Sequence, residues 1–222
     1  MWTLYFRPGT CAMASYLALE EAAAPYRAID MTDRTDELKT LNPRGKVPAL
    51  EIDGQILREN IAIIDLIANR LPEAELLPRD DLARAQCMSS LAWFASTLHI
   101  DYRRFLKPQV YEPSWPEAQE GVSREGARQY RLDLQELDDM LKSGGEWLHG
   151  NPQRTAADLY GLVFVDWAVR SKLYDPAWRA IAAWVDRLRL RAAVARVLEL
   201  TGSPLMAGVP TRISQSNEGD SR

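Results

Sequence analysis

Residues 42–54 read NPRGKVPALEIDG, and this stretch decides the fold. Pro48 opens an apolar run, and a proline, which has no N–H to donate, is tolerated only at the start or the edge of a strand. Val47 is therefore held in an extended conformation, before a bond for which the cis isomer costs little. Asp53-Gly54 lies between two apolar-rich runs and predicts a tight hairpin turn. The local unit is a loop, an antiparallel hairpin and a helix that begins near Glu59.

The residues before this stretch predict a strand, a helix and a second strand. Residues 3–6 are an aromatic and apolar run that ends at Pro8-Gly9, residues 11–24 have helical composition and spacing, and residues 26–31 form the next strand. A right-handed crossover joins the two parallel strands. With the hairpin this gives a βαβ unit followed by ββα. If the strands are neighbours, Val47 lies beside the turn at residues 8–11.

Strand signals vanish in the second half of the chain. Residues 72–81 contain two prolines and four acidic residues, so we place a linker at 77–83, between an N-terminal domain of residues 1–76 and an all-helical domain of residues 84–210. Two long amphipathic patterns, residues 82–107 and 117–143, begin the helical domain. Residues 211–222 are polar and predict a tail.

Thr155-Ala156-Ala157-Asp158 has the form of a capping box, in which Asp158 reaches back to the N–H of Thr155. The helix that follows is apolar around most of its circumference and should be the buried centre of the helical domain. Further on, a basic run through Arg187, Arg189 and Arg191 predicts a solvent-exposed helix face.

Composition excludes several classes of function. The chain has 222 residues with 46% hydrophobic content, and its 27 basic and 31 acidic residues give a net charge of -4, so no general attraction for nucleic acid or anionic membrane is expected. Apolar runs are too short for a membrane span, and the N-terminus lacks a secretion-signal pattern. The two cysteines, Cys11 and Cys87, fit a reducing compartment. We expect a cytoplasmic protein with no metal, because no Cys or His cluster has zinc-ligand spacing.

Four motifs together resemble the cytosolic glutathione S-transferases, most closely the bacterial beta class. They are PGTC at 8–11, NPRGKVPAL at 42–50, EN at 59–60, and WL at 147–148 with TAADL at 155–159. The resemblance covers nearly the whole chain. It implies a thioredoxin-like N-terminal domain, a cis bond before Pro48, a helical C-terminal domain, a homodimer, glutathione as co-substrate and a transferase activity of the detoxification type.

The resemblance also implies where glutathione binds. Val47, before the cis Pro48, would pair its backbone with the cysteinyl part of glutathione. Glu59 and Asn60 would hold the γ-glutamyl end at a helix N-terminus, where free N–H groups favour a carboxylate. Asn60 stands where the family usually has Ser or Thr, and an amide can also donate and accept hydrogen bonds.

Three further positions complete the implied site. Arg34 falls where beta-class enzymes tend to have a basic residue near the glycyl carboxylate of glutathione. His99 falls where they have a histidine near the active site, with an ordinary helix histidine as the alternative. Lys46 is placed with the glutathione-binding residues, and a solvated loop charge is its alternative.

Cys11, with Thr10 as helper, is the predicted catalytic residue. A cysteine at the start of a helix is favoured as a thiolate by the helix dipole and free N–H groups. The alternative is a small buried apolar residue. No second cysteine lies close in sequence, so redox chemistry would pass through a mixed disulfide with glutathione.

The sequence therefore predicts a glutathione-dependent transferase that conjugates, or exchanges thiols between, glutathione and a small apolar electrophile. The electrophile would lie between the domains, where aromatic residues around 93–111 suggest an apolar pocket. A binding or scaffold protein with little catalysis, and a glutathione-dependent disulfide reductase using the same site, are the alternatives. The sequence does not name the second substrate.

Overall fold

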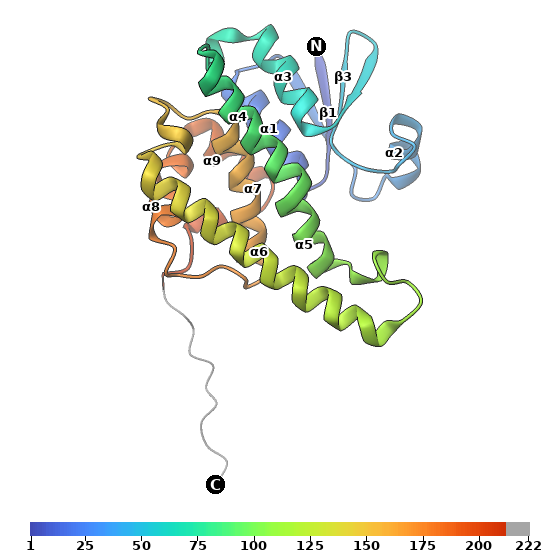
Figure 1. Ribbon diagram of the computed structural model, residues 1–222. Coiled ribbons are helices and arrows are strands. Elements are labelled where there is room, and N and C mark those ends of the chain that lie inside the picture. The colour runs from blue at the N-terminus through green and yellow to red at the C-terminus, as the bar shows by residue number, and fades with distance from the viewer. Residues whose placement is uncertain (212–222) are drawn as a thin grey trace.

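The computed structural model describes residues 1–211, so the predicted tail, apart from its first residue, lies outside the described residues. The N-terminal part alternates strands and helices as predicted (Figure 1). In chain order its elements are β1 (Trp2–Phe6), α1 (Ala12–Glu21), β2 (Tyr26–Asp30), α2 (Thr35–Leu41), β3 (Ala49–Ile52), β4 (Gln55–Arg58) and α3 (Asn60–Arg70).

The strands form one mixed sheet in the order β2-β1-β3-β4. β1 and β2 are parallel, and β3 is antiparallel to both β1 and β4. The β3–β4 hairpin turns at Asp53 and Gly54, which both have positive φ, as a two-residue turn requires. The Val47–Pro48 bond is cis, and Pro48 immediately precedes β3. The predicted thioredoxin-like βαβ-ββα unit is confirmed.

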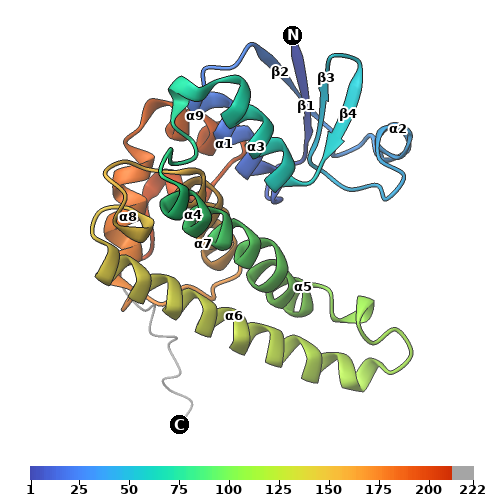
Figure 2. The ribbon, with the colours of Figure 1, turned by 45° about the horizontal axis from the view of Figure 1, so that its top comes forward.

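The two faces of the sheet are covered differently. α1 and α3 cover the face that looks toward the helical part, while α2 lies on the other side (Figure 2). On the first face Leu4 and Leu50 are fully buried in the main core. The second face holds a small separate cluster, which consists of Tyr5, Met31, Leu38 and Ala49.

The rest of the described chain is helical, as predicted. Its elements are η1 (Pro72–Ala74), α4 (Asp81–Trp93), η2 (Phe94–Leu98), α5 (His99–Leu106), η3 (Pro108–Val110), α6 (Pro116–Gly144), η4 (Leu148–Gly150), α7 (Ala156–Arg170), α8 (Arg179–Arg189), α9 (Ala192–Leu200) and η5 (Pro204–Ala207). A π-helical turn, η2, joins α4 to α5, so the helix predicted over residues 82–107 changes its winding midway. No helix within residues 1–211 combines the length and the apolarity that crossing a membrane needs.

α7 is the centre of the helical part, because every residue from Ala156 to Ala168 is buried. The predicted capping box is confirmed: the Thr155 N–H donates to Asp158 Oδ2 at 2.7 Å. The segment before α4 is also tied down, since the Ala156 N–H donates to the Leu76 carbonyl at 2.7 Å. The domain limits and the linker at 77–83 stay predictions.

α1 joins the two parts of the molecule by packing against α7 and α9. At its C-terminal end, the buried Glu21 carboxylate receives Arg154 Nη2 and Arg191 Nε, each at 2.7 Å. The predicted solvent-exposed basic face is confirmed only in part for Arg191, because its side chain is 40% exposed but pairs with a buried carboxylate. Arg187 is also engaged, because it donates to the Glu146 carbonyl at 2.6 Å.

Gly126 lies where α6 crosses α5, and replacing it by alanine should destabilise the protein. A Cβ at this position would lie 2.5 Å from the Phe105 nitrogen and 2.8 Å from the Asp101 carbonyl oxygen, so the helices would have to separate. Overpacking of this kind costs about 1–3 kcal/mol. A lower midpoint of urea unfolding for Gly126→Ala is the expected result.

Gly121 on the same helix is the matched control. A Cβ there meets nothing within 4 Å, so Gly121→Ala should stabilise the protein by about 0.5–1 kcal/mol through helix propensity. Equal shifts of the two variants would contradict the close crossing of α5 and α6.

Candidate functional site

A cavity of about 600 Å³ is lined by both parts of the molecule. Its N-terminal wall comes from the turn after β1, the loop at 42–48 and the start of α3, and its other wall from α5 and α7. The cavity brings together most of the predicted site residues, namely Thr10, Cys11, Lys46, Val47, Pro48, Glu59, Asn60 and His99.

Arg34 is the predicted residue that does not line the cavity. It precedes α2, and its Nε lies 2.7 Å from Glu37 Oε2 on the surface. Basic residues that line the same wall instead are Arg7, Arg44 and Arg58. Sequence patterns missed them because their positions depend on how the loop at 42–48 folds against β1 and β4.

Cys11 lies directly before α1, and its thiol donates to the Val47 carbonyl at 3.8 Å. The predicted adjacency of Val47 and the turn after β1 is thereby confirmed. Burial raises the pKa of the Cys11 thiol to about 11, although a contact with Asn60 lowers it. The structure therefore favours the protonated thiol over the predicted thiolate. Burial destabilises the thiolate by more than the hydrogen bonds at the helix N-terminus stabilise it.

The Thr10 hydroxyl closes the turn that carries Cys11. It donates to the Arg7 carbonyl at 2.7 Å and accepts a longer contact from the Ala12 N–H at 3.4 Å. Since a hydroxyl has one proton to donate, Thr10 shapes the turn and has no donor left for a sulfur atom.

Asn60 begins α3 and holds it against α1. Its side chain is buried, Nδ2 donates to the Cys11 carbonyl at 3.0 Å, and Oδ1 accepts from the Ser15 hydroxyl at 2.7 Å. The preceding Glu59 has φ of 70°, a left-handed conformation that is uncommon for a residue with a side chain. Glu59 turns the chain into α3 and leaves its carboxylate exposed, 3.5 Å from an Arg44 nitrogen.

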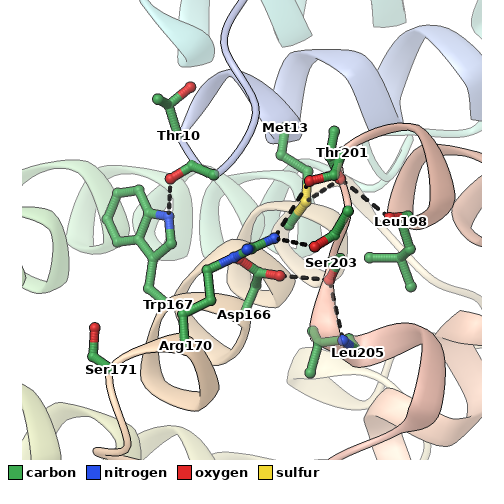
Figure 3. Close-up of polar contacts among 12 residues, drawn as sticks. Thr10, Met13, Asp166, Trp167, Arg170, Ser171, Leu198, Thr201, Ser203 and Leu205 are labelled. Atoms are coloured by element: carbon green, nitrogen blue, oxygen red, sulfur yellow. Dashed lines mark hydrogen bonds and ion pairs between the residues drawn. The ribbon is translucent and has the colours of Figure 1, made fainter.

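His99 lies at the start of α5 with its ring edge-on to Trp167, at 5.1 Å between ring centroids. Burial, followed by the charges of Arg103 and Lys46, lowers the pKa of His99 to about 4, so the imidazole is neutral at neutral pH. The Trp167 indole N–H donates to the Gly9 carbonyl at 3.0 Å and so fixes α7 to the turn that carries Cys11 (Figure 3).

Comparisons with known proteins agree with this geometry. Residues 10–70 match the family model for the N-terminal domain of glutathione S-transferases. Over 207 residues the chain is 28% identical to glutathione S-transferase GstA of Escherichia coli O157:H7, covering 90% of this chain and 98% of that protein. Residues 10–70 therefore match a glutathione S-transferase N-terminal domain, and nearly the whole chain is similar to bacterial glutathione S-transferases. A shorter match, 37% identical over 71 residues, is to a probable maleylacetoacetate isomerase of Caenorhabditis elegans, covering 31% of this chain and 33% of that protein.

Solved structures of bacterial glutathione transferases are similar to this protein along most of its length. A glutathione transferase homologue from Sulfitobacter with bound glutathione has a TM-score of 0.82 at 28% identity, over 90% of this chain and 98% of that one. The beta-class enzyme of Sphingomonas chungbukensis has a TM-score of 0.77 at 29% identity, over the same shares of the two chains, 90% and 98%. The predicted resemblance to the beta class is confirmed.

Tyr160 is a cavity residue that sequence patterns did not single out. Its ring is buried within α7, and Tyr160 lines the cavity together with Cys11 and Asn60. Burial, and then the nearby Cys11, raise the pKa of the Tyr160 hydroxyl, so it stays protonated at neutral pH. No signal marked it, because an aromatic residue in an apolar helix is expected to be core.

Proposed function

We propose that this protein is a glutathione S-transferase that conjugates glutathione to a small electrophile, with the protonated Cys11 thiol donating a hydrogen bond to the glutathione sulfur. The observation that carries the proposal is the contact of Cys11 Sγ with the Val47 carbonyl, inside the cavity and beside the cis Pro48. It puts a thiol donor and an extended backbone edge at the same point of the cavity wall.

Glutathione is a short peptide, so its cysteinyl backbone can pair with the extended edge at Val47. When the cysteinyl N–H takes the Val47 carbonyl, the Cys11 thiol loses its acceptor and is free to donate to the glutathione sulfur. The γ-glutamyl carboxylate would lie at the start of α3, where backbone N–H groups and Asn60 meet the cavity. Arg44 and Lys46 supply positive charge on the same wall.

The conjugation step needs the glutathione thiol to lose its proton. The resulting thiolate attacks the electrophile, a carbon–sulfur bond forms, and the leaving group departs with its electron pair. Cationic side chains and the Cys11 hydrogen bond stabilise the thiolate and so lower the pKa of the bound glutathione. His99 is neutral but weakly basic, so we assign the released proton to solvent.

Thiol–disulfide exchange is the second candidate for this site. It would require Cys11 itself to attack as a thiolate, and a thiol with a pKa of about 11 is almost entirely protonated at neutral pH. The raised pKa therefore favours conjugation over disulfide reduction. A binding protein with little catalysis remains the third reading, and a homodimer remains part of the proposal.

Substitution of Cys11 tests the proposed role. We expect glutathione to bind in a calorimetric titration at millimolar concentration, and Cys11→Ala to lower kcat for an aryl halide by about tenfold or more, because a hydrogen bond to a charged group contributes about 1.5–3 kcal/mol. Cys11→Ser should keep most of the conjugating activity, since a hydroxyl also donates. For a mixed disulfide of glutathione, Cys11→Ser should be as inactive as Cys11→Ala.

Cys87 is the matched control cysteine. It is buried on α4 outside the cavity, so Cys87→Ala should leave the kinetics unchanged. Absence of glutathione binding would contradict the proposed function. Binding without turnover of either substrate would favour the scaffold reading, and turnover of the mixed disulfide alone would favour the reductase.

A further inference from the structure

We infer that the second substrate carries a carboxylate, and that Arg103 and Lys107 on the helical wall of the cavity bind it. This inference rests on the proposed conjugation at the same site and names the class of electrophile. It adds a carboxylate to the apolar electrophile predicted from sequence.

The cavity lining is strongly cationic. Its basic side chains are Arg7, Arg44, Lys46, Arg58, Arg103 and Lys107, whereas Glu59 is its one carboxylate among the described residues. The protein as a whole is acidic, with a net charge of -4. The positive charge is therefore concentrated at the cavity and attracts anions to it.

The cations of the N-terminal wall are sufficient for glutathione. Arg7 is anchored by bonds to the Met31 carbonyl at 2.8 Å and to the Thr35 hydroxyl at 3.1 Å. Arg44 and Lys46 flank the Val47 edge, and the start of α3 supplies backbone donors. These groups together match the two carboxylates of glutathione, which leaves the cations of the helical wall without a role in binding it.

Arg103 lies one turn after His99 on the same side of α5, and Lys107 is the residue directly after this helix, with its N–H bonded to the Arg103 carbonyl at 2.8 Å. All three residues line the cavity. The charge of Arg103 also contributes to the lowered pKa of His99, because it would repel a protonated imidazole. Arg103 and Lys107 carry like charges at a four-residue spacing, so they repel each other. An anion placed between them removes that repulsion.

Ion pairing within the protein does not account for these two residues. The side chains of Arg103 and Lys107 form no hydrogen bond or ion pair with any residue in the range 1–211. Arg103 is partly buried, and its guanidinium lies 5.9 Å from the centre of the Tyr111 ring, which Arg104 approaches to 5.8 Å. Stacking on Tyr111 orients the guanidinium and leaves its N–H donors free for a planar carboxylate.

The helical wall also carries apolar and aromatic side chains beside its two cations, namely Ala95, Ile100, Tyr102, Leu106, Tyr160 and Trp167. Of the five aromatic residues predicted to line it, only Tyr102 does so. The others are Trp93, Phe94, Phe105 and Tyr111. Phe94, for example, stacks on Phe164 in the core at 5.4 Å between ring centroids. This lining fits a substrate that has an apolar body and carries a carboxylate.

The test uses two presynthesised S-aryl conjugates of glutathione that differ only in a carboxylate and its methyl ester, so it does not depend on turnover. Calorimetry of the full chain should show the carboxylate conjugate binding about tenfold tighter, which is about 1.4 kcal/mol. Arg103→Met and Lys107→Met should each remove most of this preference while leaving the affinity for glutathione unchanged. Added salt should weaken the carboxylate conjugate more than the ester.

Arg124→Met is the control for net charge, because Arg124 is an exposed residue of α6 outside the cavity. It should keep the full preference for the carboxylate. Equal affinity of the two conjugates, or an equal loss for both in Arg103→Met, would overturn the inference while leaving the proposed function intact. If neither glutathione nor either conjugate binds, the proposed function fails as well.

Discussion

Asp158→Ala is expected to lower the free energy of unfolding by about 4–5 kcal/mol, far more than the loss of a helix cap. The Asp158 carboxylate is fully buried and accepts from four donors. Besides the N–H and hydroxyl of Thr155, at 2.7 and 3.1 Å, it accepts from the Leu148 N–H at 3.0 Å and the Trp184 indole N–H at 2.9 Å. Truncation leaves these donors buried without an acceptor.

Urea unfolding followed by tryptophan fluorescence measures this effect, and Asp80→Ala is the matched control. Asp80 caps α4 with a bond of 2.9 Å to the Ala83 N–H, and it is exposed, so its loss should cost only the usual 0.5–2 kcal/mol, about 1 kcal/mol in most proteins. If the two variants lose similar stability, Asp158 acts as a simple cap and the four-donor arrangement contributes little.

Glu21→Ala is expected to lower the free energy of unfolding by about 3 kcal/mol, because it leaves two arginines without their carboxylate. Glu21 joins α1 to Arg154, before α7, and to Arg191, before α9. Arg154 is itself buried and also donates to the Ala74 carbonyl at 3.0 Å, so it has no route to solvent. Arg191 is partly exposed, so water can hydrate it in the variant. The expected loss of stability is therefore at the lower end of the range for breaking buried ion pairs.

Acid should weaken the same interaction. Burial by itself raises the pKa of Glu21, but Arg191 and Arg154 outweigh it and hold the pKa below the ordinary value of 4.5. A lowered folded-state pKa contributes stability above the unfolded pKa and loses it as the pH falls through the folded value. Between neutral pH and about pH 5 the contribution should therefore stay constant, and below that it should disappear.

The control for Glu21 is Glu125, which pairs with Arg128 at 2.7 Å on the surface of α6. Exposed pairs of this kind contribute little, so Glu125→Ala should leave the urea midpoint nearly unchanged. A Glu21→Ala variant whose stability matches that of Glu125→Ala, with the same dependence on acid, would show that Glu21 does not hold the two parts together.

Local patterns were enough to place the main elements of the candidate site. Pro48 and the Asp53-Gly54 turn fixed a strand start and a hairpin, because each restricts backbone dihedrals whatever the surroundings. Cys11 and Val47 were predicted to be neighbours from strand order, and they are. Arg34 was predicted to bind glutathione but does not line the cavity, because its side chain pairs with the nearest carboxylate, that of Glu37.

Properties that depend on burial were not available from the sequence. Helix position alone suggested an ionised Cys11, whereas burial within the cavity wall raises the pKa of its thiol. Arg191 was predicted to face solvent, yet the docking of α9 against α1 places it beside Glu21. In both cases the decisive contact joins residues far apart in the chain, and no local period encodes such a contact.

By itself the sequence determined the order of elements, the strand start at Pro48 and the capping box before α7, because turn chemistry and hydrophobic periodicity act within a few residues. Only the tertiary structure decided the charge of the cavity and the state of its groups. Desolvation and Coulomb interactions depend on distance through space, and α5 and α7 bring Arg103, His99 and Tyr160 to the wall that faces Cys11. The proposed role of Cys11 and the proposed carboxylate site both follow from that assembly.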